Sequence, residues 1–222
     1  MTDILSHLLE HKIVAIIRGA KPQDVVKIAS ALNDGGVKNI EITLNSPDAL
    51  SAIKEVSTEL GDQVLVGAGT VLDPETARSA ILAGAKFILS PTVNTETIKL
   101  TKRYGAVSIP GAFSPTEILT AYENGGDIIK VFPARLGASY IKDIRGPLPH
   151  IPLLPTGGVS LDNIQEFEEA GAVGFGIGSS LVDTNREITH AYLQELTQKA
   201  KAYVAAVNRI TKGEKVHENY KL

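Results

Sequence analysis

Asn39-Ile40-Glu41-Ile42-Thr43-Leu44 is a short run rich in apolar and β-branched residues, and Asn45-Ser46-Pro47 follows it directly. Such a run predicts a buried strand over residues 39–44. Serine is a common helix N-cap and proline is tolerated in the first helical turn, so the next helix is expected over Pro47–Leu60 with Ser46 as its cap. Strand, short loop and helix together form one unit.

The same unit recurs along the chain. The other predicted strands are Ile13–Ile17, Val64–Gly67, Phe87–Leu89, Ala106–Ile109, Ile128–Phe132, Ile151–Leu154 and Val173–Ile177. Helical patterns lie between them, among them Pro22–Asn33, Pro74–Ala83, Glu96–Tyr104 and Pro115–Glu123. Regular alternation favours a parallel α/β sheet, and eight units favour a closed (β/α)8 TIM barrel. An open doubly wound sheet is the alternative.

A single domain is expected over residues 1–222, because 222 residues with 43% apolar content suit one α/β domain. An opening helix near Asp3–His11 precedes the barrel. The barrel is expected over about residues 12–208, and the polar segment 211–222 is expected to be a surface tail.

Composition excludes several function classes. The net charge is −3 and no basic cluster occurs, so neither nucleic acid nor an anionic membrane is expected as a partner. The absence of cysteine excludes disulfides and thiolate chemistry. No apolar run approaches the roughly 20 residues that span a bilayer, and no signal-peptide pattern opens the chain, so a cytoplasmic location is expected.

One motif points to a metal. The stretch His7-Leu8-Leu9-Glu10-His11 matches the H-x-x-E-H pattern of some zinc peptidases. It lies in the predicted opening helix, away from the strand ends, and the remaining histidines form no ligand set. A solvated helix face is the better interpretation, and we expect no metal site.

Active sites of barrels lie where the strands end and the following loops begin. Polar residues and glycines occur at each of these predicted ends. They are Arg18, Glu41, Thr43, Asn45, Gly69-Thr70, Ser90-Pro91, Pro110-Gly111, Lys130, Thr156-Gly157-Gly158 and Gly178-Ser179-Ser180.

Lys130 stands within the apolar run 128–132. Burial of an amine is costly unless the amine is paired or its pKa falls. A lysine of lowered pKa is a nucleophile that forms Schiff bases with carbonyls. The alternative is a lysine that is paired with a carboxylate at the rim of the sheet.

Side-chain alternation places Glu41 and Lys130 on corresponding faces of their strands. Glu41 lies opposite the face of Ile40 and Ile42, and Lys130 lies opposite the face of Ile129. If the aliphatic faces meet the helices, the glutamate and the lysine both point into the barrel, where interior layers draw on alternate strands. The pair is then either a buried ion pair or a general acid/base beside an amine nucleophile.

The last two predicted strand ends are rich in glycine. Thr156-Gly157-Gly158 and Gly178-Ser179-Ser180 let backbone N–H groups approach an anion closely, at the two loops where barrels frequently bind phosphate. Tight turns are the alternative. Neither segment matches a Walker or dinucleotide-binding fingerprint.

These residues, in this order, resemble the 2-keto-3-deoxy-6-phosphogluconate (KDPG) and 4-hydroxy-2-oxoglutarate (KHG) aldolase family of class I aldolases. The resemblance runs from Ile13 to about Val182. The segments that carry it are Glu41-Ile42-Thr43-Leu44, Gly67-Ala68-Gly69-Thr70-Val71-Leu72, Ser90-Pro91, Pro110-Gly111, Lys130-Val131-Phe132-Pro133-Ala134 and Pro155-Thr156-Gly157-Gly158.

The resemblance implies a lyase that forms a homotrimer of (β/α)8 barrels and needs neither metal nor cofactor. Its substrates would be a phosphorylated keto acid and pyruvate. Lys130 would be the Schiff-base lysine and Glu41 the general acid/base. The implied substrate-binding residues are Arg18, Thr43, Asn45, Thr70, Ser90, Pro91 and Phe132. The implied phosphate-binding residues are Thr156, Gly157, Gly158, Gly178 and Ser179.

The sequence departs from the gluconate branch at Asn45, where those members usually carry an arginine that contacts the substrate carboxylate. Asn45 together with Arg18 looks like the 6-phosphogalactonate branch, whereas Phe132-Pro133-Ala134 and Pro155–Gly158 look like the gluconate branch. KDPG is therefore the expected substrate, with 2-keto-3-deoxy-6-phosphogalactonate as the alternative and KHG as a further one. A phosphate-binding isomerase or synthase without Schiff-base chemistry is a more remote alternative, as is a non-catalytic phosphosugar sensor.

Overall fold

The computed structural model describes residues 4–212, with side chains described as far as Val207. The strands are β1 (Ile13–Ile17), β2 (Asn39–Thr43), β3 (Leu65–Gly69), β4 (Phe87–Leu89), β5 (Val107–Ile109), β6 (Gly111–Ala112), β7 (Ile129–Val131), β8 (Leu153–Pro155) and β9 (Phe175–Ile177). The helices are α1 (Ile4–His11), α2 (Pro22–Asp34), α3 (Ala49–Leu60), α4 (Pro74–Leu82), α5 (Thr95–Arg103), α6 (Pro115–Glu123), α7 (Ala138–Arg145), α8 (Ile164–Glu169) and α9 (His190–Lys212).

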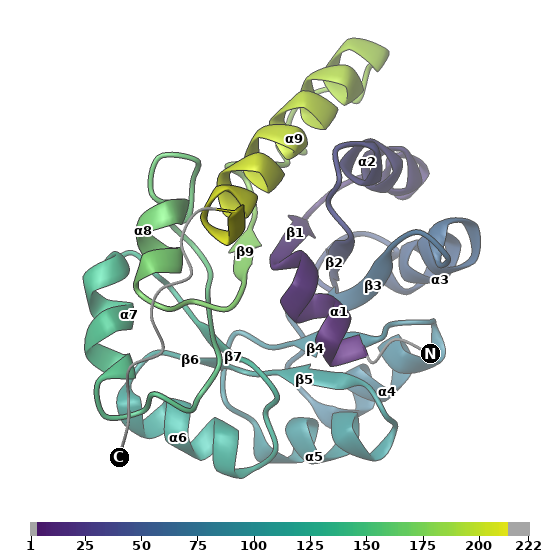
Figure 1. Cartoon of the computed structure of the whole chain (residues 1–222). Coiled ribbons are helices and arrows are strands. Elements are labelled where there is room, and N and C mark those ends of the chain that lie inside the picture. The colour runs from purple at the N-terminus through teal and green to yellow at the C-terminus, as the bar shows by residue number, and fades with distance from the viewer. Residues whose placement is uncertain (1–3, 213–222) are drawn as a thin grey trace.

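All strand pairs are parallel and form a six-stranded sheet in the order β5-β4-β3-β2-β1-β9 and a three-stranded sheet in the order β6-β7-β8. Strand follows strand in sequence order, and β9 pairs with β1. A doubly wound sheet reverses direction at its first strand, so that alternative is wrong. The described chain has a TIM-like α/β fold, with helices α2–α8 around the strands (Figure 1).

Hydrogen bonds connect the two sheets at both edges. Near β5, the Asp127 amide donates to the Ser108 carbonyl at 2.9 Å, and at β9 the Val173 amide donates to the Leu153 carbonyl at 2.9 Å. The described chain has nine strands where eight were predicted, because Pro110 separates β5 from β6. Proline has no N–H to donate to a strand ladder, so it interrupts the pairing.

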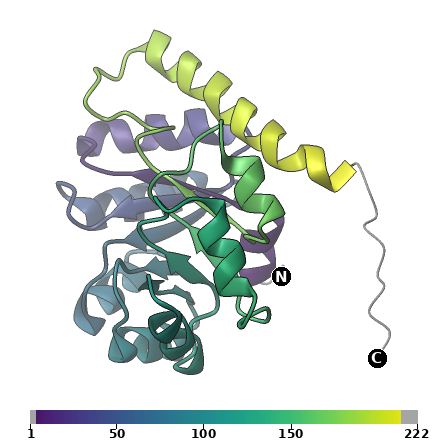
Figure 2. The same ribbon diagram turned by 90° about the vertical axis from the view of Figure 1, so that its left-hand side faces the viewer.

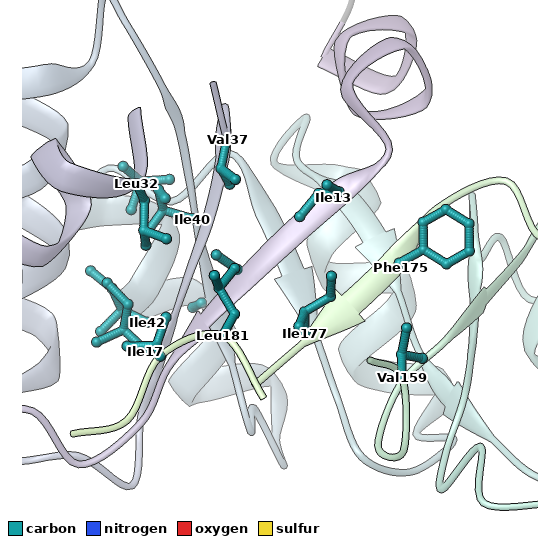
Figure 3. Packing of buried hydrophobic residues seen from close by; sticks show 14 of the residues in the cluster. Ile13, Ile17, Leu32, Val37, Ile40, Ile42, Val159, Phe175, Ile177 and Leu181 are labelled. Carbon is teal, nitrogen blue, oxygen red and sulfur yellow. The ribbon is translucent and has the colours of Figure 1, made fainter. Parts of the chain in front are cut away.

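The outward faces of the strands form the larger core. Ile40 and Ile42 of β2 are fully buried in the same cluster as Leu32 of α2 and Phe175 of β9, part of which Figure 3 shows. This alternation matches the predicted parity, in which aliphatic residues face the helices. The same parity turns the intervening residues of each strand inward.

A second core lies on the inward faces of the strands, and α1 covers it. Leu8 of α1 clusters with inward-facing residues of the strands, including Val14, Phe87 and Leu154. In Figure 1, α1 lies across the strands. Because Leu8 packs on residues near the beginnings of β1 and β4, α1 covers the N-terminal ends of the strands and leaves the C-terminal ends open.

The helix starts were partly predicted. Asp73 and Ser114 cap α4 and α6 as expected, each accepting a backbone N–H. The Ser46 prediction is wrong, since α3 begins at Ala49 with Asp48 at its N-cap. The Ser46 hydroxyl instead accepts from the Gly19 amide at 2.8 Å, which ties the loops after β1 and β2 together.

The C-terminal helix α9 runs along one side of the molecule (Figure 2) and includes residues 211 and 212, so the helix extends into the segment expected to be a tail. The rest of the predicted tail, residues 213–222, lies outside the described residues. None of the described helices is long and apolar enough to cross a membrane.

Candidate active site

Glu41 and Lys130 are buried on the inward faces of the two sheets, in the middle of β2 and β7. Their side chains are 0% and 3% exposed. Lys130 is flanked by Gly111 of β6 and Leu154 of β8, which share its inward face. The structure therefore brings together the two groups that strand parity predicted to face inward.

The buried pair is not held as a direct ion pair within the described part of the chain. Neither carboxylate oxygen of Glu41 has a hydrogen-bond partner there. Burial raises the pKa of Glu41, and the positive charges of Lys130 and Arg18 only partly oppose this. Burial likewise lowers the pKa of Lys130, against the opposing charge of Glu41 and with a smaller contribution from Arg18. Both shifts favour the neutral forms, which are an amine nucleophile and a carboxyl group that can donate a proton.

Two inward-facing glycines make room for these polar side chains. A Cβ at Gly69 of β3 would collide with the carboxylate of Glu41. A Cβ at Gly176 of β9 would collide with the hydroxyl of Thr156, a buried group that has no partner among the described residues. We infer that glycine at both positions is required by close packing around the site.

A cavity of about 650 Å³ opens at the C-terminal ends of β1, β7, β8 and β9. Seven of the predicted site residues line it, namely Arg18, Phe132, Thr156, Gly157, Gly158, Gly178 and Ser179. The ammonium of Lys130 lies 5.1 Å from the ring centroid of Phe132. Phe132 thus connects the buried lysine to the wall of the cavity.

Arg18 connects the cavity to the polar residues after β2 and β3. Its guanidinium donates to Asn45 Oδ1 at 2.9 Å and to Thr70 Oγ1 at 3.3 Å. Thr70 has φ of +58°, a conformation that costs a β-branched residue about 1–3 kcal/mol. Such strain is concentrated at functional sites, so the position of Thr70 is a sign of function as well as of folding.

The other predicted residues lie nearby but outside the lining of this cavity. Thr43 is buried at the end of β2, with its hydroxyl 2.9 Å from that of Ser46. Ser90 and Pro91 follow β4, and their backbone lies against Gly111, the residue paired with Lys130. They are neighbours of the lysine through this strand.

A model of the "KDPG and KHG aldolase" family matches residues 4–198. This chain belongs to the KDPG and KHG aldolase family.

Relatives within the family carry two substrate names. The 2-dehydro-3-deoxy-6-phosphogalactonate aldolase of Escherichia coli K12 is 34% identical over 87% of this chain and 93% of its own length. The 2-dehydro-3-deoxy-phosphogluconate aldolase of Pseudomonas aeruginosa is 38% identical over 71% of this chain and 72% of its own. The Legionella pneumophila KDPG aldolase, solved with pyruvate captured as a covalent carbinolamine, superposes with a TM-score of 0.79, at 27% identity over 89% of this chain and 96% of that one.

The polar residues of this aldolase-family chain that line the cavity but were not predicted from the sequence include Arg135, Asp183 and Thr184. Arg135 follows β7, and Asp183 and Thr184 follow β9. The Thr184 hydroxyl donates to the Arg18 carbonyl at 2.6 Å, which fastens the last loop over the first. Their position after a strand end was the available signal for all three. Arg135 lies several residues beyond Lys130, and Asp183 and Thr184 lie several residues beyond Gly178-Ser179, the residues that drew attention.

The zinc-peptidase pattern lies away from this cavity. His7 and His11 are on α1, with ring centroids 4.3 Å apart. In the described part of the chain, no group of three or more His, Cys, Asp or Glu side chains is arranged to hold a metal ion.

Proposed function

We propose that this chain is a class I aldolase that cleaves KDPG to pyruvate and glyceraldehyde 3-phosphate, with Lys130 as the Schiff-base lysine. The observation that carries the proposal is a buried Lys130 that shares the inward side of the strands with a buried Glu41 lacking a hydrogen-bond partner, and that lies 5.1 Å from Phe132 in the wall of the cavity. A structural ion pair would show a direct contact instead. Borohydride reduction in the presence of pyruvate tests the proposal, because it traps an iminium.

In the proposed mechanism, neutral Lys130 attacks the C2 carbonyl, and loss of water with a proton from the Glu41 carboxyl gives an iminium and leaves Glu41 as a carboxylate. Glu41, directly or through water, removes the proton from the C4 hydroxyl. The C3–C4 bond breaks, its electrons pass to the iminium as an enamine, and the aldehyde phosphate leaves. Glu41 then assists protonation of C3, and hydrolysis releases pyruvate and the amine.

The same proposal includes a closed (β/α)8 barrel. Its support is the set of hydrogen bonds at both edges of the two sheets, with β5 and β6 counted as one strand split at Pro110. The homotrimeric assembly and the cytoplasmic location stay predictions. Sedimentation velocity would measure the first.

The substrate carboxylate is proposed to bind between Arg18 and Thr70. Asn45 cannot supply the charge-assisted bidentate contact of an arginine, whereas the Arg18 guanidinium already lies at this position. The alternative is that Arg18 contacts the C4 hydroxyl. Asn45 is smaller than the arginine it replaces, which leaves the C4 configuration less tightly selected. 2-keto-3-deoxy-6-phosphogalactonate is therefore the alternative substrate, and KHG a further one.

Arg18→Lys should lower kcat/KM about tenfold or more and leave the fold intact, since a point charge replaces a planar fork at an exposed position. The parent enzyme should cleave both 6-phosphate epimers. Steady-state kinetics with each epimer measures both effects. Unchanged kinetics in the variant, or strict selectivity of the parent enzyme for the gluconate epimer, would contradict this assignment.

The phosphate is proposed to bind at Gly157, Gly158, Gly178 and Ser179, with Thr156 beside them. Gly157 and Gly158 have φ of +79° and +104°, a conformation that favours glycine and turns backbone N–H groups toward an anion. A hydrogen bond of 2.8 Å from the Ser180 hydroxyl to the Val159 carbonyl holds the two loops together. Both loops line the same cavity.

Inorganic phosphate should therefore compete with substrate, and crystals grown in sulfate or phosphate should hold the anion between these loops. Competition is measured by the change in apparent KM with phosphate concentration, with chloride at equal ionic strength as the control. If an unphosphorylated keto acid were cleaved as efficiently as its 6-phosphate, the phosphate site would be wrong.

A further inference from the structure

The cavity contains two arginines in different settings. Arg18 is engaged by Asn45 and Thr70, and it acts electrostatically on both Glu41 and Lys130. It therefore belongs to the end of the cavity where the proposed chemistry takes place. Arg135 lines the cavity next to Gly158, and no hydrogen bond, ion pair or ring contact joins its side chain to another residue in the described range.

The side chain of Arg135 lies against the loop that contains Gly157 and Gly158. Its Cγ lies 3.5 Å from the position that a Cβ on Gly158 would occupy. The backbone just before it is fixed, because the Ala134 amide donates to the Thr156 carbonyl at 2.8 Å. The aliphatic part of the Arg135 side chain thus lies beside Gly158, and the backbone next to it is held by a hydrogen bond.

The proposed phosphate site lacks a positive charge of its own. Its loops offer backbone N–H dipoles and hydroxyls, whereas a phosphate monoester carries about −1.5 to −2 charges at neutral pH. The other charged residue that lines this cavity is Asp183, which is an anion. Its Oδ1 accepts hydrogen bonds from the backbone and side-chain amides of Asn185. An unengaged arginine whose stem lies beside Gly158 supplies the missing charge, and its guanidinium is a fork that matches phosphate oxygens.

We propose that Arg135 binds the phosphate of the substrate and so makes this chain selective for phosphorylated over unphosphorylated keto acids. The inference rests on the proposed aldolase function. Arg135 acts there as a binding residue and takes no part in the chemistry at C2 to C4. A solvated surface arginine with no role is the alternative that the experiment must separate from it.

Arg135→Ala should lower the ratio of kcat/KM for the 6-phosphate substrate to kcat/KM for its unphosphorylated counterpart by about 10–100-fold, the scale of a lost charge-assisted hydrogen bond. Inhibition by inorganic phosphate should weaken in parallel. Arg135→Lys should retain part of both effects, because the charge remains and the fork is lost. Arg103→Ala is the matched control, since it removes an exposed arginine at the end of α5, outside the cavity lining, and should leave the ratio unchanged.

Two outcomes would overturn the inference: an unchanged ratio in Arg135→Ala, whether or not both rates fall, or inhibition by inorganic phosphate that is as strong in this variant as in the parent. Failure of the proposed aldolase function would be detected by a different measurement, borohydride trapping. If the parent enzyme forms no borohydride-trapped adduct with pyruvate, the aldolase proposal fails. If the parent and Arg135→Ala are both labelled at Lys130 and the ratio does not move, only the role of Arg135 fails.

Discussion

Borohydride reduction in the presence of pyruvate should attach one reduced pyruvate to the protein, at Lys130. Lys130→Arg should abolish this label and lower kcat by more than about 10⁴-fold, the scale on which loss of a nucleophile acts in other covalent enzymes. Arginine keeps a long basic side chain at this position, but it stays protonated and so provides no nucleophilic amine. Intact-mass and peptide mass spectrometry of the trapped protein, together with turnover rates, measure both effects.

Lys99→Arg provides the matched control, because Lys99 is an exposed lysine whose contact is an i,i+3 pair with Glu96 on α5. That variant should be labelled and active like the parent. An adduct at a lysine other than Lys130, or cleavage without any adduct, would remove the covalent mechanism. Retained label in Lys130→Arg would have the same consequence.

Glu41→Gln should lower kcat by about 10²–10⁴-fold, the usual contribution of a positioned general acid/base. The shape of the side chain is kept while its ionisable proton is lost. The variant should not unfold at a lower temperature near neutral pH. Burial raises the pKa of Glu41, so at pH values above the ordinary carboxyl pKa this residue lowers the free energy of unfolding. Glutamine carries no ionisable proton and removes this cost.

The pH profile gives a second test of Glu41. Its negative charge raises the pKa of Lys130, against the lowering by burial. Removal of the Glu41 charge should lower the pKa of Lys130 further. The kcat/KM that remains in Glu41→Gln should therefore begin to rise at a lower pH than in the parent, because Lys130 loses its proton at a lower pH. Glu55→Gln, on the exposed face of α3, is the control and should change neither rate nor profile. Near-normal turnover in Glu41→Gln would assign the base to another group.

Much of the fold followed from local pattern. The β-branched runs identified the eight predicted strand segments, because such residues suit a pleated and buried surface. Pro110 lay just beyond one predicted run, and its effect on the strand ladder depended on pairing with β4 and β7 on either side. Ser46 matched an N-cap by type, yet the neighbouring loop at Gly19 provided its partner instead. Caps of this kind compete with tertiary contacts that the local sequence does not contain.

The amino-acid sequence by itself determined that Glu41 and Lys130 face the same interior, because side chains alternate along a strand with a fixed period of two. Only the tertiary structure decided that the two are not joined as an ion pair, since that depends on side-chain reach between the two sheets and on the space left by Gly69. The convergence of Arg18, Arg135 and Thr184 on one cavity was likewise a tertiary outcome. These residues are far apart in the chain and lie in loops, where side chains do not alternate with a fixed period. Their positions therefore could not be predicted from the sequence.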